Sequence, residues 1–338
     1  IVMLAFSGEH FSARRGLCIE LEALKEQIEA IASEQGLDFF ETRFELCRSD
    51  EIHMLAAYGG FPNRYPHWRF GMDYLQMQRC YDYGASKIYE LVINSDPAYA
   101  YLLESNRIVD HKLVMSHVYG HVDFFKNNIW FGNTHRDMLD RTATHGAHIR
   151  RIAQSQGEGV VEEFLDACLS IENLVDPYLG ASPIIGGNPV HLSFPDKGLD
   201  PRHMDVVAYI CEYGALKPWQ RTILSIVREE SCYFVPQLRT KVINEGWATF
   251  WHTHLMTQFV VSEADIVDYA TQHARACTQQ AHQINPYKLG VELFRHIEQR
   301  WDQGKYGQEY EACDDISARN SWNVQSKKGR EKIFSVRQ

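Results

Sequence analysis

Two histidines four residues apart are the first feature of this sequence that points to chemistry. They are His117 and His121, in the stretch SHVYGH at 116–121. On an ideal helix, positions i and i+4 are separated by about 40° in azimuth and about 6 Å along the axis. Both imidazoles can therefore reach one ion, at about 2.0–2.1 Å for zinc. The spacing is half of the HExxH signature of zinc peptidases, with Val118 in place of the catalytic glutamate. Two ordinary core or surface histidines are the alternative.

A carboxylate for the same ion lies in a second stretch, NEGWATFWHTH at 244–254. Several zinc peptidases place a third ligand, a glutamate, in an NExxA pattern on a later helix, and Asn244, Glu245 and Ala248 follow that pattern. Two histidines and one glutamate leave an open coordination position, as catalytic zinc sites do. We predict that His117, His121 and Glu245 bind one metal ion. The ion is zinc in this prediction; iron, or no metal at all, are the alternatives.

His252 stands seven residues after Glu245, about 10 Å further along a helix axis. One straight helix can hardly direct both side chains at the same ion. We predict that His252 lines the pocket and contacts either the substrate or a partner of the metal ligands; a core histidine of fixed tautomer is the alternative. The neighbouring Trp251 is predicted to bind substrate.

Hydrolysis also needs a general base, and Val118 cannot supply one. Glu90 lies within the apolar stretch YELVI, and Glu230 adds a charge to an apolar helical stripe. Burial would raise the pKa of either carboxyl group into the range that suits a base. Glu90 is preferred, because a strand before the metal-binding helix commonly lines the substrate groove in zinc peptidases. For both residues, a structural ion pair with an arginine is the alternative.

The loop YPHWRFG at 65–71 adds His67 and Arg69 to the predicted substrate-binding residues. Arginine offers a bidentate fork that can clamp a substrate carboxylate. In the alternative reading, Trp68 anchors this loop to the core.

These residues depend on a mainly helical fold with a small strand element. Apolar periodicity and helix-capping residues predict helices. The predicted helical ranges are 17–35, 111–125 after Asp110, 218–230, 241–257, 263–282 and 287–301. IYELVIN at 88–94 predicts a strand. Convergence of the ligands requires the helices 111–125 and 241–257 to face each other with this strand alongside. We therefore predict a zincin-like helix arrangement around a metal pocket.

Length and composition limit the function classes. The 338 residues suit a single domain, and the Gly- and Pro-rich stretch 176–202 would be the loop between its two lobes if it has two. A net charge of −10 argues against nucleic-acid and anionic-membrane partners. No apolar run approaches the roughly 20 residues that a membrane span needs. Eight cysteines without a CxxC pair are typical of reduced thiols, so we predict a cytoplasmic location.

The sequence resembles the stage V sporulation protein R family in six stretches that keep the family's order. These stretches are YPHWRFG, YELVINSDPAYAYL, VMSHVYGHVDFFKNN, WQRTILSIVREES, PQLRTKVINEGWATFWH and INPYKLG. The resemblance implies a cytoplasmic bacterial protein, linked in spore-formers to assembly of the peptidoglycan cortex. It also implies a serine-kinase-like protein as a partner. Family members usually extend beyond GREKIF, so the C-terminal part of the family is expected to be absent here. The resemblance supplies no catalytic residue.

Three functions fit these observations. The first is a zinc-dependent hydrolase of amide bonds, acting on a small peptide or a muropeptide-like substrate. The second is a non-catalytic binding or scaffold protein that works with a kinase-like partner, which the missing glutamate at Val118 favours. The third is an iron-dependent oxidoreductase with the same two histidines and one carboxylate.

Overall fold

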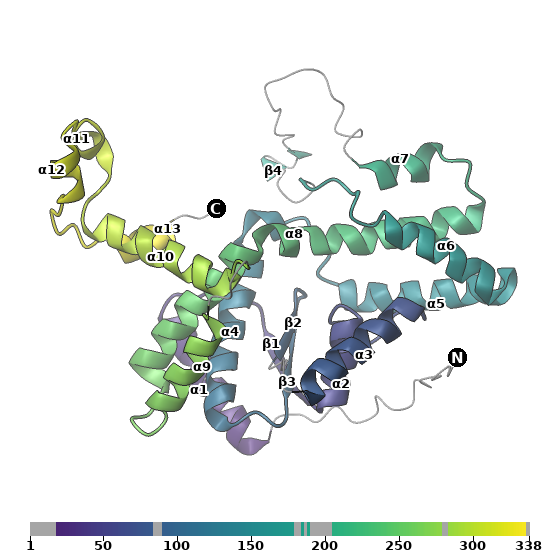
Figure 1. Ribbon diagram of the computed structural model, residues 1–338, viewed down its shortest axis with the longest axis horizontal. Coiled ribbons are helices and arrows are strands. Elements are labelled where there is room, and N and C mark those ends of the chain that lie inside the picture. Colours follow the sequence, from purple (N-terminus) through teal and green to yellow (C-terminus); the bar gives the residue numbers. More distant parts are fainter. Residues whose placement is uncertain are drawn as a thin grey trace.

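A computed structural model describes residues 18–83, 90–178, 184–185, 188–189, 205–278 and 283–335 (Figure 1). The described chain is mainly helical with a small three-stranded sheet, which confirms the mainly helical part of the predicted fold class. The α-helices are α1 (Ile19–Glu34), α2 (Ser49–Ala57), α3 (Trp68–Asp82), α4 (Ile108–Asn127), α5 (Met138–Gln156), α6 (Glu158–Ser170), α7 (Val206–Tyr213), α8 (Pro218–Leu255), α9 (Ile266–Ala276), α10 (Pro286–Asp302), α11 (Gly307–Glu311), α12 (Ile316–Asn320) and α13 (Gly329–Ser335). A 3-10 turn covers Ile129–Phe131, and a π-helical turn, Met256–Val260, follows α8.

The sheet contains β1 (Thr42–Cys47), β2 (Glu90–Ile93) and β3 (Ala98–Leu103) in the order β1-β3-β2. β1 runs parallel to β3, whereas β2 is antiparallel to it and forms an edge. β2 corresponds to the predicted strand at 88–94, of which residues 88–89 lie outside the described part. β1 and β3 were not predicted. β3 is the central strand and is buried along most of its length, so it lacks the apolar–polar alternation that identifies a strand. Two short strands, β4 (Ile184–Ile185) and β5 (Asn188–Pro189), pair with each other.

The longest helix is α8, and it corrects the prediction of two helices at 218–230 and 241–257. The structure has 38 continuous helical residues with Pro236 in the interior. A proline there costs one backbone hydrogen bond and normally ends or kinks a helix. Here α8 packs against α6 and α7 with its first part and against α4 and α10 with its second part (Figure 1). Burial in two apolar clusters, one at each half, offsets the missing hydrogen bond.

Other helix ends differ by a few residues from the prediction. α4 begins before Asp110, whose carboxylate accepts the backbone N–H of Arg107 from within the first helical turn at 3.1 Å. α9 is shorter than the predicted 263–282, and 279–282 lie outside the described residues. Most of the predicted loop at 176–202 also lies outside them. In the part of the chain that is described, no helix combines the length and the apolar composition of a membrane span.

Small residues let α8 approach both of its neighbours closely. A Cβ atom on Gly120 of α4 would lie 2.8 Å from Cα of Ala248 on α8. A Cβ atom on Gly246 of α8 would lie 2.4 Å from Cα of Gly290 on α10. Gly120 therefore stands where the backbones of α4 and α8 approach each other closely. α8 is held between two helices at backbone-contact distance, directly beside Glu245.

We expect Gly246→Ala to destabilise the protein by about 1–3 kcal/mol, because the new methyl group meets backbone atoms that cannot move aside. The loss should exceed the roughly 1 kcal/mol that alanine gains over glycine inside a helix. Chemical denaturation measures the change.

Gly71→Ala is the matched control. Gly71 lies in α3, and nothing stands within 4 Å of the Cβ position. The same substitution should leave stability unchanged or raise it by up to about 1 kcal/mol. Equal effects at both sites would contradict the close approach of α8 and α10.

Candidate metal centre

The two histidines of α4 and the glutamate of α8 converge in the structure. Nε2 of His117 and Nε2 of His121 each lie 3.5 Å from Oε2 of Glu245. One ligand atom from each residue lies within 4.8 Å of the others. The histidines are 3% and 6% exposed, so both imidazoles are removed from bulk water. The structure thus brings the three predicted ligands together, facing one point.

The outer nitrogens of both histidines have partners. Nδ1 of His121 lies 2.9 Å from the side-chain oxygen of Asn244, and Nδ1 of His117 lies 2.9 Å from Nδ1 of His252. Because the Asn244 oxygen only accepts, Nδ1 of His121 carries the proton and Nε2 presents a lone pair. Nε2 of His117 and Oε2 of Glu245 are buried without a hydrogen-bond partner. Acceptor atoms that face one another in this way are stabilised by a cation between them.

Without a metal, a proton has to fill that role. Burial favours the neutral form of Glu245, but the two histidines 3.5 Å away outweigh burial and hold the pKa of Glu245 well below the ordinary value. Burial also opposes protonation of His121, but Glu245 outweighs it and raises the pKa of His121. Burial lowers the pKa of His117, and His121 adds to that effect. Two nitrogens and one carboxylate oxygen are a donor set that fits zinc.

Two further ionisable groups border this centre. Glu90 lies on β2, and burial raises its pKa to about 7; the charge of His121 opposes the rise and that of Glu245 adds to it. Tyr287 is the second residue of α10, and its ring stacks on His117 at 5.9 Å between centroids and 27° between planes. Burial, with Glu245 and Glu90, raises the pKa of the Tyr287 hydroxyl.

The sequence does not single out Tyr287. Its stretch, INPYKLG, reads as a helix start, since Asn285 caps α10 and Pro286 opens it. An aromatic residue in the first turn of a helix does not indicate which side chains it will contact in the fold. Only the packing of α10 on α8 brings Tyr287 to the two histidines of α4.

His252 contacts a candidate ligand rather than an open pocket. Its side chain is 2% exposed and lies between His117 and His273. His252 thus contacts the candidate ligand His117 directly, and its predicted contact with a substrate stays a prediction.

Glu230, the reserve base, is in the wrong place. It lies on α8, about 22 Å along the helix axis from Glu245. Its carboxylate forms an ion pair with Arg64 and accepts a hydrogen bond from Nδ1 of His145 at 3.2 Å. Glu230 is therefore a buried, paired carboxylate, as the alternative reading held.

His67 and Arg69, the predicted substrate clamp, have acidic partners in the structure, and their contact with a substrate stays a prediction. Nε2 of His67 lies 3.1 Å from Asp166, and Arg69 donates to Glu172 at 2.7 Å. Both residues thus pair with acidic side chains on α6 or just after it, away from the three candidate ligands. Trp251 is fully buried in the apolar cluster around α4 and the end of α8, so it is a core residue and not a substrate contact.

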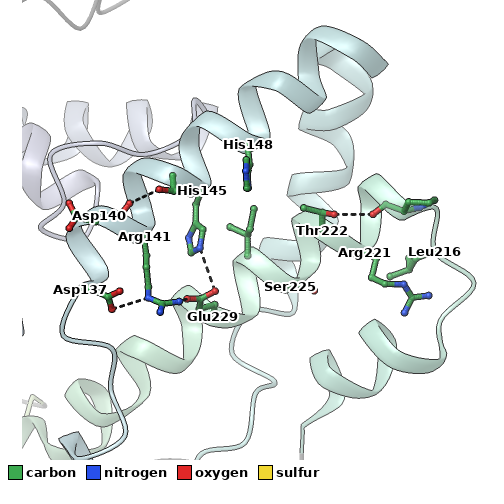
Figure 2. Close-up of a pocket in the computed structure, with 13 residues that line it drawn as sticks. Asp137, Asp140, Arg141, His145, His148, Leu216, Arg221, Thr222, Ser225 and Glu229 are labelled. Atoms are coloured by element: carbon green, nitrogen blue, oxygen red, sulfur yellow. Dashed lines mark hydrogen bonds and ion pairs between the residues drawn. The ribbon is translucent and has the colours of Figure 1, made fainter.

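A cavity of about 940 Å³ lies between α5 and the first half of α8, and none of the candidate ligands lines it (Figure 2). Some of its charged side chains pair with one another. Arg141 donates to Asp137 at 2.9 Å and to Glu229 at 2.7 Å, and His145 lies 3.4 Å from Glu229. The cavity is therefore separate from the candidate metal centre.

Comparison with known proteins places the chain in a family. The model of the family described as "SpoVR like protein" matches residues 17–186 and 193–338. The chain belongs to this SpoVR-like family. It is 32% identical over 323 residues to "Uncharacterized protein YcgB" of Escherichia coli (strain K12). That match covers 82% of this chain and 63% of the relative, so the chain spans less than two thirds of the relative's length. No solved structure matches the chain.

We expect protein purified without chelator or affinity nickel to contain about one zinc ion per chain, held by three ligands of a catalytic-type site. Glu245→Gln and His117→Ala should each lose most of it, because two ligands seldom retain zinc. Elemental analysis measures the content.

His148→Ala serves as the control, since His148 is an exposed histidine on α5 next to the separate cavity. Its zinc content should equal that of the unmodified chain. A zinc content that survives in Glu245→Gln and His117→Ala would place the metal elsewhere.

Proposed function

We propose that this SpoVR-like chain is a metal-dependent hydrolase of amide bonds, with zinc bound by His117, His121 and Glu245. One observation carries the proposal. Three ligand atoms from two buried helices converge within 4.8 Å, and two of them have no hydrogen-bond partner. Such atoms are costly to bury unless a cation pairs with them.

The proposed arrangement is zincin-like. A histidine pair on α4 faces a glutamate on the later helix α8, and β2 packs against α4 at the edge of the sheet. An edge strand has backbone N–H and C=O groups available to an extended peptide. Support for a peptide substrate comes from this edge, which carries Glu90.

A zinc ion bound there would polarise the carbonyl group of the amide and lower the pKa of water. Glu90 is the proposed general base: its half-buried carboxylate takes the proton of the attacking water and returns it to the leaving amine. The Tyr287 hydroxyl is proposed to donate a hydrogen bond to the oxygen on which negative charge develops. Tyr287 keeps its proton for this role, because burial and two nearby carboxylates disfavour its ionised form.

The proposed substrates are small peptides of the muropeptide type. This step rests on family membership and on the link to the peptidoglycan cortex that the family resemblance implies, and not on a feature of the site. A kinase-like protein partner is proposed on the same basis.

Val118 favours a second candidate, a binding protein without catalysis. Its side chain is fully buried in the core and offers no acid or base to the centre. The two candidates therefore differ in whether Glu90 acts as a base. Iron instead of zinc in the elemental analysis would favour the oxidoreductase, since two histidines and one carboxylate also suit iron.

We expect Glu90→Gln to lower turnover of soluble muropeptides by about 10²–10⁴-fold while zinc stays bound, because the amide cannot accept a proton. Release of free amino groups measures turnover, and elemental analysis on the same samples measures zinc.

Glu230→Gln replaces a buried glutamate by the same amide. It should lower stability through the lost Arg64 pair, while the folded fraction keeps its turnover. If the zinc-loaded wild-type chain cleaves none of a panel of muropeptides and simple peptides, the binding-protein candidate replaces the hydrolase.

A further inference from the structure

A line of hydrogen-bonding side chains runs outward from His117 to α9. Nδ1 of His117 lies 2.9 Å from Nδ1 of His252, and Nε2 of His252 lies 3.0 Å from Nδ1 of His273. Nε2 of His273 then lies 3.9 Å from Sγ of Cys277. The line joins α4, α8 and α9 and ends on the thiol that follows α9.

Such a line has a direction. A neutral imidazole has one N–H donor and one acceptor nitrogen, so each ring that donates on one side accepts on the other. In the outward direction, His117 donates to His252 and His252 donates to His273. His273 then carries its proton on Nε2, facing Cys277. This direction leaves Nε2 of His117 as a lone pair aimed at Glu245.

The inward direction has the opposite effect on the centre. His252 would donate to Nδ1 of His117, and the His117 proton would sit on Nε2, where a metal ion would have to bind. His252 alone does not select a direction, because either of its two ring nitrogens can carry the proton. His121 has no such ambiguity, since the Asn244 oxygen can only accept.

We propose that His252 and His273 are positioning residues that hold His117 in the tautomer presenting Nε2 to the metal. This inference rests on the proposed metal centre. Mutation of the residue that orients a ligating histidine typically lowers metal affinity by about 10–100-fold. α9, which supplies no ligand, would thereby set the affinity of a site formed by α4 and α8.

The test compares zinc affinity among variants by competition with a chromophoric zinc chelator. His252→Leu and His273→Leu remove an acceptor, and each should weaken zinc binding by about 10–100-fold. His273→Asn places an amide oxygen near the former Nδ1, so it should restore most of the affinity. Rescue by asparagine separates hydrogen bonding from packing, because leucine and asparagine are similar in size.

His254→Leu is the matched control. His254 lies two residues after His252 on α8 and contacts Gln35 and Arg330 instead of the line. Its zinc affinity should stay within about twofold of wild type. Should His252→Leu fail to fold, the His273 pair decides, since His273 is only partly buried.

The outcomes are distinguishable. A wild-type chain that binds no zinc overturns both the metal centre and this inference. A wild-type chain that binds zinc, with both leucine variants within twofold of it, overturns only the inference. Equal weakening in His273→Leu and His273→Asn also overturns it, because packing alone would then be responsible. Imidazole ¹⁵N spectra of zinc-loaded wild type should show the His252 proton on Nε2; a proton on Nδ1 contradicts the proposed direction.

Discussion

The close approach of α8 to its two neighbours is the constraint on which the rest of the structure depends. Gly120 and Ala248 let α8 meet α4, and Gly246 lets it meet Gly290 of α10. Glu245 directly precedes Gly246 and stands three residues before Ala248, so contacts between backbones fix the position of its backbone. Larger residues at the crossings would push α8 away from its neighbours and displace Glu245 from both histidines. A metal centre tolerates errors of only a few tenths of an ångström.

Because of that constraint, the three groups are held where a positive charge among them would stabilise the structure. Three acceptor-bearing groups are removed from water and face one point, which is unfavourable without a positive charge among them. The surrounding groups make a positive charge at this point still more favourable. Asn244 holds the outer nitrogen of His121 in a hydrogen bond, and Glu90 adds a half-buried carboxyl group nearby. A centre of this kind is stabilised by a cation and destabilised without one, which couples metal binding to folding.

The two halves of α8 use buried charge differently. In the first half, Glu230 is matched by Arg64 and His145, and the neighbouring Glu229 by Arg141, so these carboxylates stabilise the packing of α5 on α8. In the second half, Glu245 has histidines but no arginine among its described partners. A carboxylate paired with arginine is already neutralised, whereas one paired with neutral imidazoles can still bind a metal ion.

The sequence by itself determined the candidate ligand set, because the i, i+4 spacing of His117 and His121 is a property of any helix and the Glu245 pattern is local. It also determined the mainly helical class through periodicity. Tertiary structure decided the rest. Glu230 and Arg69 found partners far away in sequence, and Trp251 turned to the core. Tyr287 and His273 lie at the centre only because α10 and α9 pack there. β3 was not predicted, because a strand buried on both faces lacks the apolar–polar alternation that identifies a strand. Contacts between distant segments depend on how two helices pack against each other, and the sequence of one helix alone does not predict that packing.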